Sequence, residues 1–170
     1  LVFKTFSKGP IFFKFLRFWV LQGFAVWVIL IPSLLFINSD SGRVCWIGFI
    51  IWILGFSIES LADYQKNRFK QYKKNKKNFI SSGLWRYSRH PNYFGEILCW
   101  IGIYIFVVYS LTMPEKIISL VSPTFIIVLL LFMTGIPLLE KQSDKKWGKQ
   151  KAYKEYKRKT SILIPMFPKK

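Results

Sequence analysis

Four long apolar runs restrict the fold of this sequence more than any other feature. They cover residues 18–37, 44–62, 94–111 and 117–139 of a 170-residue chain. Because an α-helix rises about 1.5 Å per residue, each run is long enough to cross roughly 30 Å of hydrocarbon. The chain between the runs is too short to form a soluble domain that could bury four such helices. We therefore expect an all-α, multi-pass transmembrane helix bundle.

Composition agrees with a membrane protein. Hydrophobic residues make up 52% of the sequence and aromatic residues 19%, and the formal net charge is +18. No small-residue cleavage site follows the first run, which therefore does not resemble a signal peptide. Cys45 and Cys99 fall in or beside the apolar runs, so we expect reduced packing residues rather than a disulfide.

The basic residues predict the orientation of the chain. Of the 26 lysines and arginines, 24 lie before the first run, in segment 63–93 or after residue 139. Positive charges are retained on the cytoplasmic side of a membrane. The pattern predicts a cytoplasmic loop at 63–93, a cytoplasmic tail at 140–170 and cytoplasmic termini, in a bacterial inner membrane or the endoplasmic reticulum. The lysines of segment 73–77 are typical of a flank facing lipid headgroups, and no nucleic-acid recognition module surrounds them.

The chain reads as a single membrane domain over residues 1–170. It begins at Leu1 without a methionine, and its first residues are basic and aromatic like those of a loop. We therefore expect a fragment that lacks one or more upstream helices.

The last part of the chain has two further structural signals. Gly135 and Pro137 predict a kink in the fourth span. Beyond it, basic residues are interspersed with Trp147, Tyr153 and Tyr156. That mixture predicts an interfacial C-terminal helix that lies against the bundle or the headgroups.

The stretch SGLWRYSRHPNYFGE, residues 82–96, concentrates polar groups just before the third span. Proline is tolerated in the first turn of a helix, so this helix is expected to begin near His90 or Pro91. The free N–H groups of its first turn would point toward Arg86 and Arg89. Such a helix start suits an anionic group, either a phosphate or a carboxylate.

In the predicted topology, three spans bring polar side chains to one layer near the cytoplasm. Asn92 and Glu96 are four residues apart and share a helix face, as do Glu59 and Asp63. One interpretation is that the arginines pair with the carboxylates and tie the bundle together. The other is a ligand pocket, since ionisable groups in membranes usually face a partner or a wet cavity. The residue types leave both open. The layer contains Glu59, Asp63, His90, Asn92, Glu96 and Glu140.

The motif GLWRYSRHPNYFGE, with the later Y…EY…RKTSILIPMFP, resembles the C-terminal half of the steroid 5α-reductase-like membrane family. The resemblance runs from about Phe12 to Pro168 and is closest to a poorly characterised bacterial and protist branch. Related RHP-x-Y-x-G segments occur in sterol reductases and in isoprenylcysteine and phospholipid methyltransferases. That core motif alone therefore does not select a reaction.

Glu96 favours the reductases within this resemblance. Reductases place an asparagine and an acid four residues apart, as NYFGE does here, and the resemblance implies that Asn92 and Glu96 hold the nicotinamide end of NADPH. In the methyltransferases the acidic position is commonly apolar or aromatic. Asp63, in LADY, matches an acid that the resemblance also assigns to the cofactor, and Glu59 stands where some relatives have asparagine.

A reductase of this kind would make further contacts to NADPH. Phosphate contacts would come from Arg86, Arg89 and Lys70, and Tyr87 or Tyr93 would lie near the adenosine or ribose. Tyr153 and Tyr156 could close the pocket. His90 is a candidate catalytic residue, but its more expected roles are to cap the helix, to orient Glu96 or to contact phosphate. No metal ion is expected. The family's substrate-facing acid and tyrosine belong to an N-terminal half that we expect this chain to lack.

Three functions follow as hypotheses. The first is an NADPH-dependent membrane reductase acting on an activated carbon–carbon double bond of a lipid-soluble substrate. The second is an S-adenosylmethionine-dependent methyltransferase of a lipid or prenylated thiol. The third is a non-catalytic membrane scaffold. Each places the protein in a lipid bilayer, and none involves nucleic acid.

Overall fold

Four helices form a membrane-spanning bundle in the computed structural model, which describes residues 11–72, 75 and 78–169. The helical spans long and apolar enough to cross a membrane are Phe15–Ile37, Trp46–Gln71, Pro91–Ser110 and Met113–Trp147. Within the described part of the chain there is no β-strand, and one isolated bridge joins Ser88 to Ser161. The predicted fold class is confirmed, and the protein is an integral membrane protein. The basic N-terminal residues 1–10 and Lys73, Lys74, Lys76 and Lys77 lie outside the described residues.

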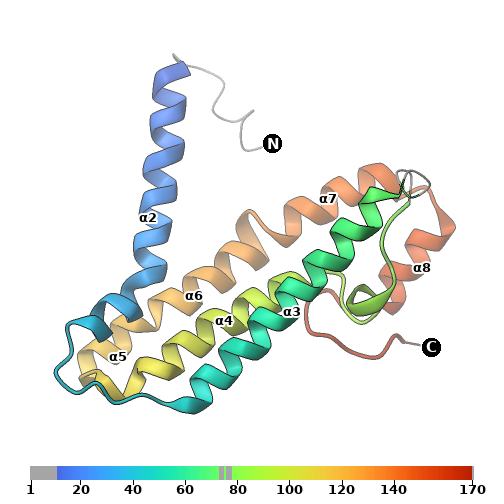
Figure 1. The fold of residues 1–170 in the computed structure, drawn as a ribbon. Helices are drawn as coiled ribbons and strands as arrows, with labels where there is room; N and C mark the ends of the chain where they lie inside the picture. The colour runs from blue at the N-terminus through green and yellow to red at the C-terminus, as the bar shows by residue number, and fades with distance from the viewer. Residues whose placement is uncertain (1–10, 73–74, 76–77, 170) are drawn as a thin grey trace.

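The helices follow one another along the chain with short connections (Figure 1). The first three spans are α2 (Ile11–Ile37), α3 (Trp46–Gln71) and α4 (Pro91–Val107), with short 3-10 turns η2 (Gly83–Arg86) and η3 (Val108–Ser110) before and after α4. The fourth span is divided into α5 (Met113–Ser119), α6 (Val121–Val128), the π-helical turn η4 (Leu129–Met133) and α7 (Ile136–Trp147), and α8 (Lys151–Lys159) follows it.

Helices α3 and α7 continue beyond the predicted ends of their spans. Helix α3 runs to Gln71 rather than ending near residue 62, and α7 runs to Trp147 rather than ending near residue 139. The first residues of the predicted loop 63–93 and of the predicted tail 140–170 are therefore helical. A helix that leaves the hydrocarbon can continue through polar residues. Helix α8 lies where the interfacial helix is predicted.

Helices α3 and α4 pack most closely, through facing glycines. A Cβ on Gly95 would lie 2.6 Å from the amide nitrogen of Glu59 and 2.6 Å from the carbonyl oxygen of Gly55. Gly48 and Gly102 face each other in the same way farther along the two helices. Small residues let backbones in a membrane approach this closely. The seam brings Glu59 directly beside the first turns of α4.

The fourth span is interrupted where Gly135 and Pro137 predict a kink. The amide nitrogen of Thr134 donates to the carbonyl of Leu129 at 3.0 Å, which closes the π-helical turn. Helix α7 then restarts with Pro137 in its first turn, where a missing N–H costs little. The helix is thus interrupted between Met133 and Ile136, at the position where the kink is predicted.

Helix α2 packs against the others only through its C-terminal half. Ser122 donates its hydroxyl to the carbonyl of Ile29 at 2.7 Å, and Val28 and Pro32 are buried. The N-terminal half stands apart from the bundle (Figure 1), with exposed apolar side chains as expected in lipid. The central core contains Ile97, Ile126 and Leu130.

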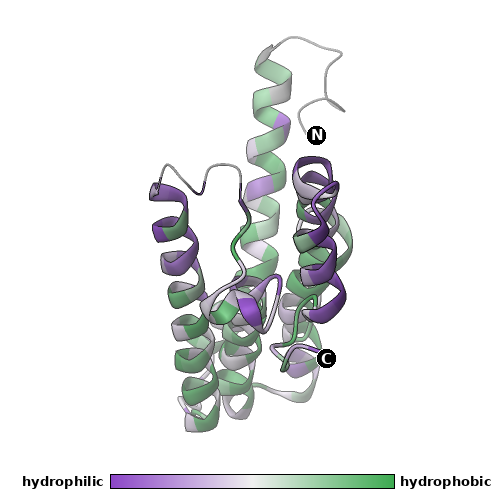
Figure 2. Cartoon of the chain, turned by 90° about the vertical axis from the view of Figure 1, so that its right-hand side faces the viewer, coloured by the Kyte–Doolittle hydropathy of each residue, from purple (hydrophilic) through white to green (hydrophobic). Residues whose placement is uncertain are grey.

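Polar residues gather at one end of the bundle (Figure 2), at the end of α3 and along α7 and α8. The C-terminal tail returns along the residues that precede α4. Arg89 donates its amide to the carbonyl of Ser161 at 2.8 Å, and Met166 donates to the carbonyl of Tyr87 at 3.0 Å. Ser88 donates its hydroxyl to the carbonyl of Leu163 at 2.6 Å. This polar end contains the candidate site.

Candidate functional site

A group of carboxylates lies between α3 and α4. Glu59 interacts electrostatically with Glu96 and with Asp63, and Glu96 also interacts with Asp63. Tyr93 interacts with Glu96 and Asp63. The glycine seam produces this grouping, because it removes the side chains that would separate the helices. Among the described residues, no group of three or more histidines, cysteines or acids is placed to hold a metal ion.

Asn92 has a polar atom in need of a partner. Its Oδ1 is buried and accepts no hydrogen bond among the described residues. An unsatisfied buried acceptor costs about 1–3 kcal/mol, so a ligand that donates to it would recover free energy. Glu96 lies one helical turn farther along α4. Both side chains carry oxygen acceptors, which suit a group with N–H donors.

Glu140 on α7 is the centre of a network of ion pairs. One of its oxygens accepts from Arg89, and the other lies 3.0 Å from Nε2 of His90. Lys157 of α8 contacts Glu140 at 3.0 Å and Asp144 at 2.7 Å. Although burial lowers the pKa of Lys157, hydrogen bonds to these two carboxylates raise it above its ordinary value overall. The network joins the start of α4 to α7 and α8, as the bundle-tie interpretation expects for Arg89.

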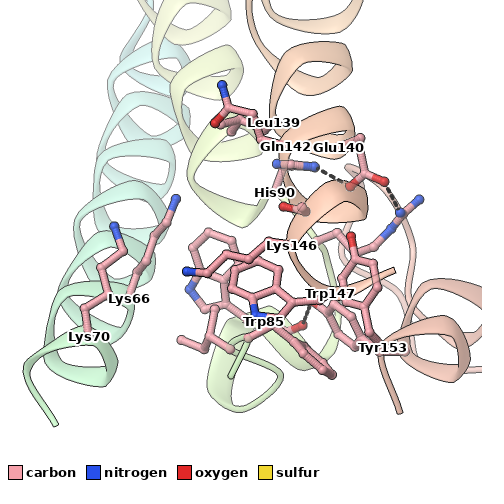
Figure 3. Close-up of a pocket in the computed structure, with 15 residues that line it drawn as sticks. Lys66, Lys70, Trp85, His90, Leu139, Glu140, Gln142, Lys146, Trp147 and Tyr153 are labelled. Carbon is pink, nitrogen blue, oxygen red and sulfur yellow. Dashed lines mark hydrogen bonds and ion pairs between the residues drawn. The ribbon is translucent and has the colours of Figure 1, made fainter. Parts of the chain in front are cut away.

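Beside this network lies a cavity of about 310 Å³ (Figure 3). Lys66 and Lys70 come from α3 on one side, and Lys146 from α7 on the other. Among the described residues none of these three lysines has a carboxylate within ion-pair distance. The cavity is therefore strongly positive. Its other lining residues are Phe79, Ile80, Trp85, Arg89, His90, Leu139, Glu140, Gln142, Ser143, Trp147, Tyr153 and Tyr156.

Aromatic rings form much of the cavity wall. The ammonium of Lys66 lies 4.9 Å from the ring centre of Trp85, and that of Lys146 lies 4.6 Å from the ring of Trp147. The indole of Trp85 donates to the carbonyl of Ala62 at 3.0 Å, which fixes the ring against α3. Flat rings next to cations suit a ligand that combines an aromatic base with phosphate.

His90 connects the cavity to the carboxylates. It lines the cavity, and its ring stacks on Tyr93 at 5.7 Å with an interplanar angle of 13°. Tyr93 in turn interacts with Glu96 and Asp63. A single ligand with an anionic part and a hydrogen-bond-donating part could therefore contact both groups.

The structure separates two residues from the predicted set. Arg86 does not line this cavity but a second one, together with Lys159 and Lys169. Tyr87 packs edge-on against Phe167 at 5.7 Å. Arg89, His90, Tyr153, Tyr156 and Lys70 line the first cavity. Glu59, Asp63, Tyr93 and Glu96 form the carboxylate group, and Asn92 lies in the first turn of α4; none of these five is among the described lining residues of the cavity.

Sequence reasoning missed several of the cavity residues. Lys66 belongs to a long basic run, in which no pattern distinguishes it from its neighbours. In the sequence alone, Trp85 resembles a tryptophan at the membrane interface, and Lys146 resembles the other lysines of the basic tail. The aromatic residues within the basic tail were the available signal, because lysines that flank membranes do not require aromatic neighbours.

Tyr156 holds the wall of the cavity, and its hydroxyl donates to the carbonyl of Trp85 at 2.6 Å. We expect Tyr156→Phe to lower the free energy of unfolding by about 1–2 kcal/mol, because the carbonyl loses its partner. Chemical unfolding in detergent measures this loss. Tyr109→Phe is the control, since Tyr109 is 63% exposed. Equal unfolding curves for the two variants would contradict the assignment.

Burial raises the pKa of Tyr156 above its ordinary value, and Arg89 opposes the shift. A tyrosine whose folded-state pKa is raised stabilises the fold fully below about pH 10, and that contribution is lost as pH rises toward the folded-state value. In Tyr156→Phe, the part of the stability loss above about pH 10 that comes from ionisation of Tyr156 should be absent.

These elements define a multi-pass helical membrane protein with a ligand-sized cavity at the polar end of its bundle. The chain belongs to the family DUF1295, described as a protein of unknown function, whose model matches residues 2–160. No curated protein and no solved structure matches the chain. The family description assigns no reaction, so the function has to be argued from the site.

Proposed function

We propose that the protein is an NADPH-dependent membrane reductase that reduces an activated carbon–carbon double bond of a lipid-soluble substrate. The observation that carries the proposal is the positive, aromatic cavity whose lining residue His90 stacks on Tyr93, which interacts with Glu96. The resemblance of the RHPNYFGE segment to steroid 5α-reductase-like proteins supports it. In the proposed topology this end of the bundle faces the cytoplasm.

The cavity would receive the phosphates and the adenine. Lys66, Lys70 and Lys146 supply positive charge to a ligand that carries several phosphate charges. Trp85 and Trp147 offer ring faces to the base. A volume of about 310 Å³ is at the lower end of the usual range for ligand pockets, which suits one part of a dinucleotide.

Asn92 and Glu96 would hold the carboxamide of the nicotinamide. The buried Oδ1 of Asn92 and the carboxylate of Glu96 both accept hydrogen bonds, and a carboxamide NH₂ group donates two. Glu59 and Asp63 lie beside them. When bound, the reduced nicotinamide supplies the hydride. The residues of this chain orient the ring and balance charge, and His90 lies between the two parts.

S-Adenosylmethionine is the competing ligand. Its sulfonium would suit the carboxylates, but it has no phosphate for a cavity whose three lysines have no carboxylate partner among the described residues. The charge of the cavity thus favours NADPH over the methyl donor.

The test is a titration of the purified full-length protein with NADPH, NADH and S-adenosylmethionine. We expect NADPH to bind most tightly. Lys66→Gln and Lys146→Gln should each weaken NADPH by about fivefold or more, since each removes a charge-assisted contact. Asn92→Ala and Glu96→Gln should weaken it by about 5- to 150-fold, the equivalent of 1–3 kcal/mol. Lys154→Gln is the matched control, because Lys154 is exposed on α8 and does not line the cavity.

Three results would contradict the reductase. Preferential binding of S-adenosylmethionine would favour a methyltransferase. Failure of the folded protein to bind any of the three would favour a scaffold. Unchanged NADPH affinity in both Asn92→Ala and Glu96→Gln would remove these residues from the nicotinamide site.

A further inference from the structure

A second cavity lies on the other side of the Phe79 and Tyr156 rings, which line both cavities. The two rings are 5.3 Å apart and form the wall between them. The second cavity, here called the outer groove, has a volume of about 430 Å³. Its lining residues are Phe79, Ser81, Arg86, Ala152, Glu155, Tyr156, Lys159, Thr160, Pro168 and Lys169.

The outer groove is positively charged. Arg86, Lys159 and Lys169 line it, and Glu155 is the one acid among its described lining residues. Glu155 pairs with Lys159 at 2.9 Å. Among the described residues the guanidinium of Arg86 has no carboxylate partner. Two of the three cations are therefore available to an anion, and the hydroxyls of Ser81 and Thr160 lie in the same lining.

The main chain fixes this arrangement. The amide of Lys169 donates to the carbonyl of Lys159 at 3.0 Å, and the hydroxyl of Thr160 donates to the carbonyl of Arg86 at 3.4 Å. The tail is thereby held across the loop that carries Arg86. The cations come from three separate segments, so the groove depends on the folded tail.

Exposed apolar side chains continue from the groove along the tail. Phe167 is 87% exposed and adjoins Pro168, and Ile162, Ile164 and Met166 are also exposed. Leu163, between the two isoleucines, instead packs on the bundle core. The tail is not a strand and bends at residues 162–164, so Leu163 faces the protein while the apolar side chains on either side of it are exposed. The amide of Met166 donates to the carbonyl of Tyr87, just before the third candidate span begins at Pro91, so the tail lies near the end of that span.

We propose that the outer groove and the tail form a binding site for an anionic phospholipid. The phosphate of the headgroup contacts Arg86 and Lys169, and the acyl chains lie along Ile164, Met166 and Phe167. A positive groove joined to an exposed apolar strip near the end of a span matches the two parts of such a lipid. The site is separate from the proposed nucleotide cavity, because the Phe79 and Tyr156 rings stand between them.

The test measures how many lipids stay bound to the detergent-purified, full-length protein by native mass spectrometry. Phosphatidylglycerol is the anionic probe, and phosphatidylcholine of the same chain length is the zwitterionic one. We expect phosphatidylglycerol to be retained preferentially. Arg86→Gln and Lys169→Gln should each lower its affinity by about fivefold, and Phe167→Ser should also lower it. Lys154→Gln, an exposed charge on α8 outside the groove, should have no effect.

Two competitors distinguish the sources of the phosphate. Glycerol phosphate and NADPH are expected not to displace the lipid. Displacement by glycerol phosphate at similar concentration would mean that the groove binds a soluble phosphate and would overturn the lipid assignment. Displacement by NADPH would assign the groove to the nucleotide and overturn it as well. If Lys154→Gln and Arg86→Gln lose phosphatidylglycerol equally, binding depends only on the overall charge of the protein. That result would also overturn the assignment of the groove to a lipid.

Discussion

Replacing Glu140 by alanine is expected to lower the free energy of unfolding by about 3 kcal/mol, the lower end of the cost of breaking a buried ion pair. Glu140 is 17% exposed and contacts Arg89, His90 and Lys157. Its removal leaves the guanidinium of Arg89, which is 13% exposed, without a counter-charge. The Nε of Arg89 is already buried without a partner among the described residues, so none of them offers a second acceptor.

Thermal and chemical unfolding in detergent measure this loss. Asp144→Asn is the matched control, since Asp144 contacts the same Lys157 but is 48% exposed. Pairs that exposed are worth about 0–1 kcal/mol. Glu140→Gln should be milder than Glu140→Ala, because the amide oxygen still accepts a hydrogen bond. Equal effects of Glu140→Ala and Asp144→Asn would show that the network does not hold α4, α7 and α8 together.

A double-mutant cycle separates this tie from a direct ligand role. If Arg89 acts through Glu140, the loss of stability in Arg89→Gln and in Glu140→Gln should not add in the double variant. NADPH affinity measured on the same preparations then distinguishes the two interpretations of Arg89. A bundle tie predicts that any folded Arg89→Gln protein binds nucleotide as before, whereas a phosphate contact predicts weaker binding.

The spans could be predicted because the bilayer imposes a length and a hydropathy on each of them. The start of α4 at Pro91 and the break near Gly135 were equally readable, since proline and glycine restrict the backbone locally. The ends of α3 and α7 could not be predicted in this way. Hydropathy reports where a helix leaves lipid, whereas the helix itself continues to Gln71 and Trp147.

The candidate site was predictable in part for a similar reason. Four-residue spacing places Asn92 with Glu96 on one face, and Glu59 with Asp63 on another. No spacing rule pairs Glu140 with Arg89 and His90, because that contact depends on how the fourth span packs. The separation of Arg86 from Arg89 also depends on the tail, which folds back between distant segments.

The glycine seam is the part of the fold on which the carboxylate group depends most. Replacing Gly95 by leucine is expected to lower the free energy of unfolding by about 3 kcal/mol. A Cβ at this position would lie 2.6 Å from backbone atoms of Glu59 and Gly55, so α3 and α4 must separate. Overpacking of this kind costs about 1–3 kcal/mol or more, and backbone atoms cannot rotate away as side chains do. The better helix propensity of leucine offsets about 1 kcal/mol at most.

Gly23→Ala is the matched control, because a Cβ on Gly23 in α2 meets nothing within 4 Å. It should leave stability unchanged or raise it by about 0.5–1 kcal/mol. Unfolding in detergent compares the two variants, and NADPH titration of the folded fraction adds a second readout. Since Glu59 and Glu96 lie beside Gly95, separation of the helices should weaken NADPH binding in Gly95→Leu but not in Gly23→Ala. If Gly95→Leu is as stable as Gly23→Ala, the two helices do not meet through their glycines, and the carboxylates of α3 and α4 do not share a site.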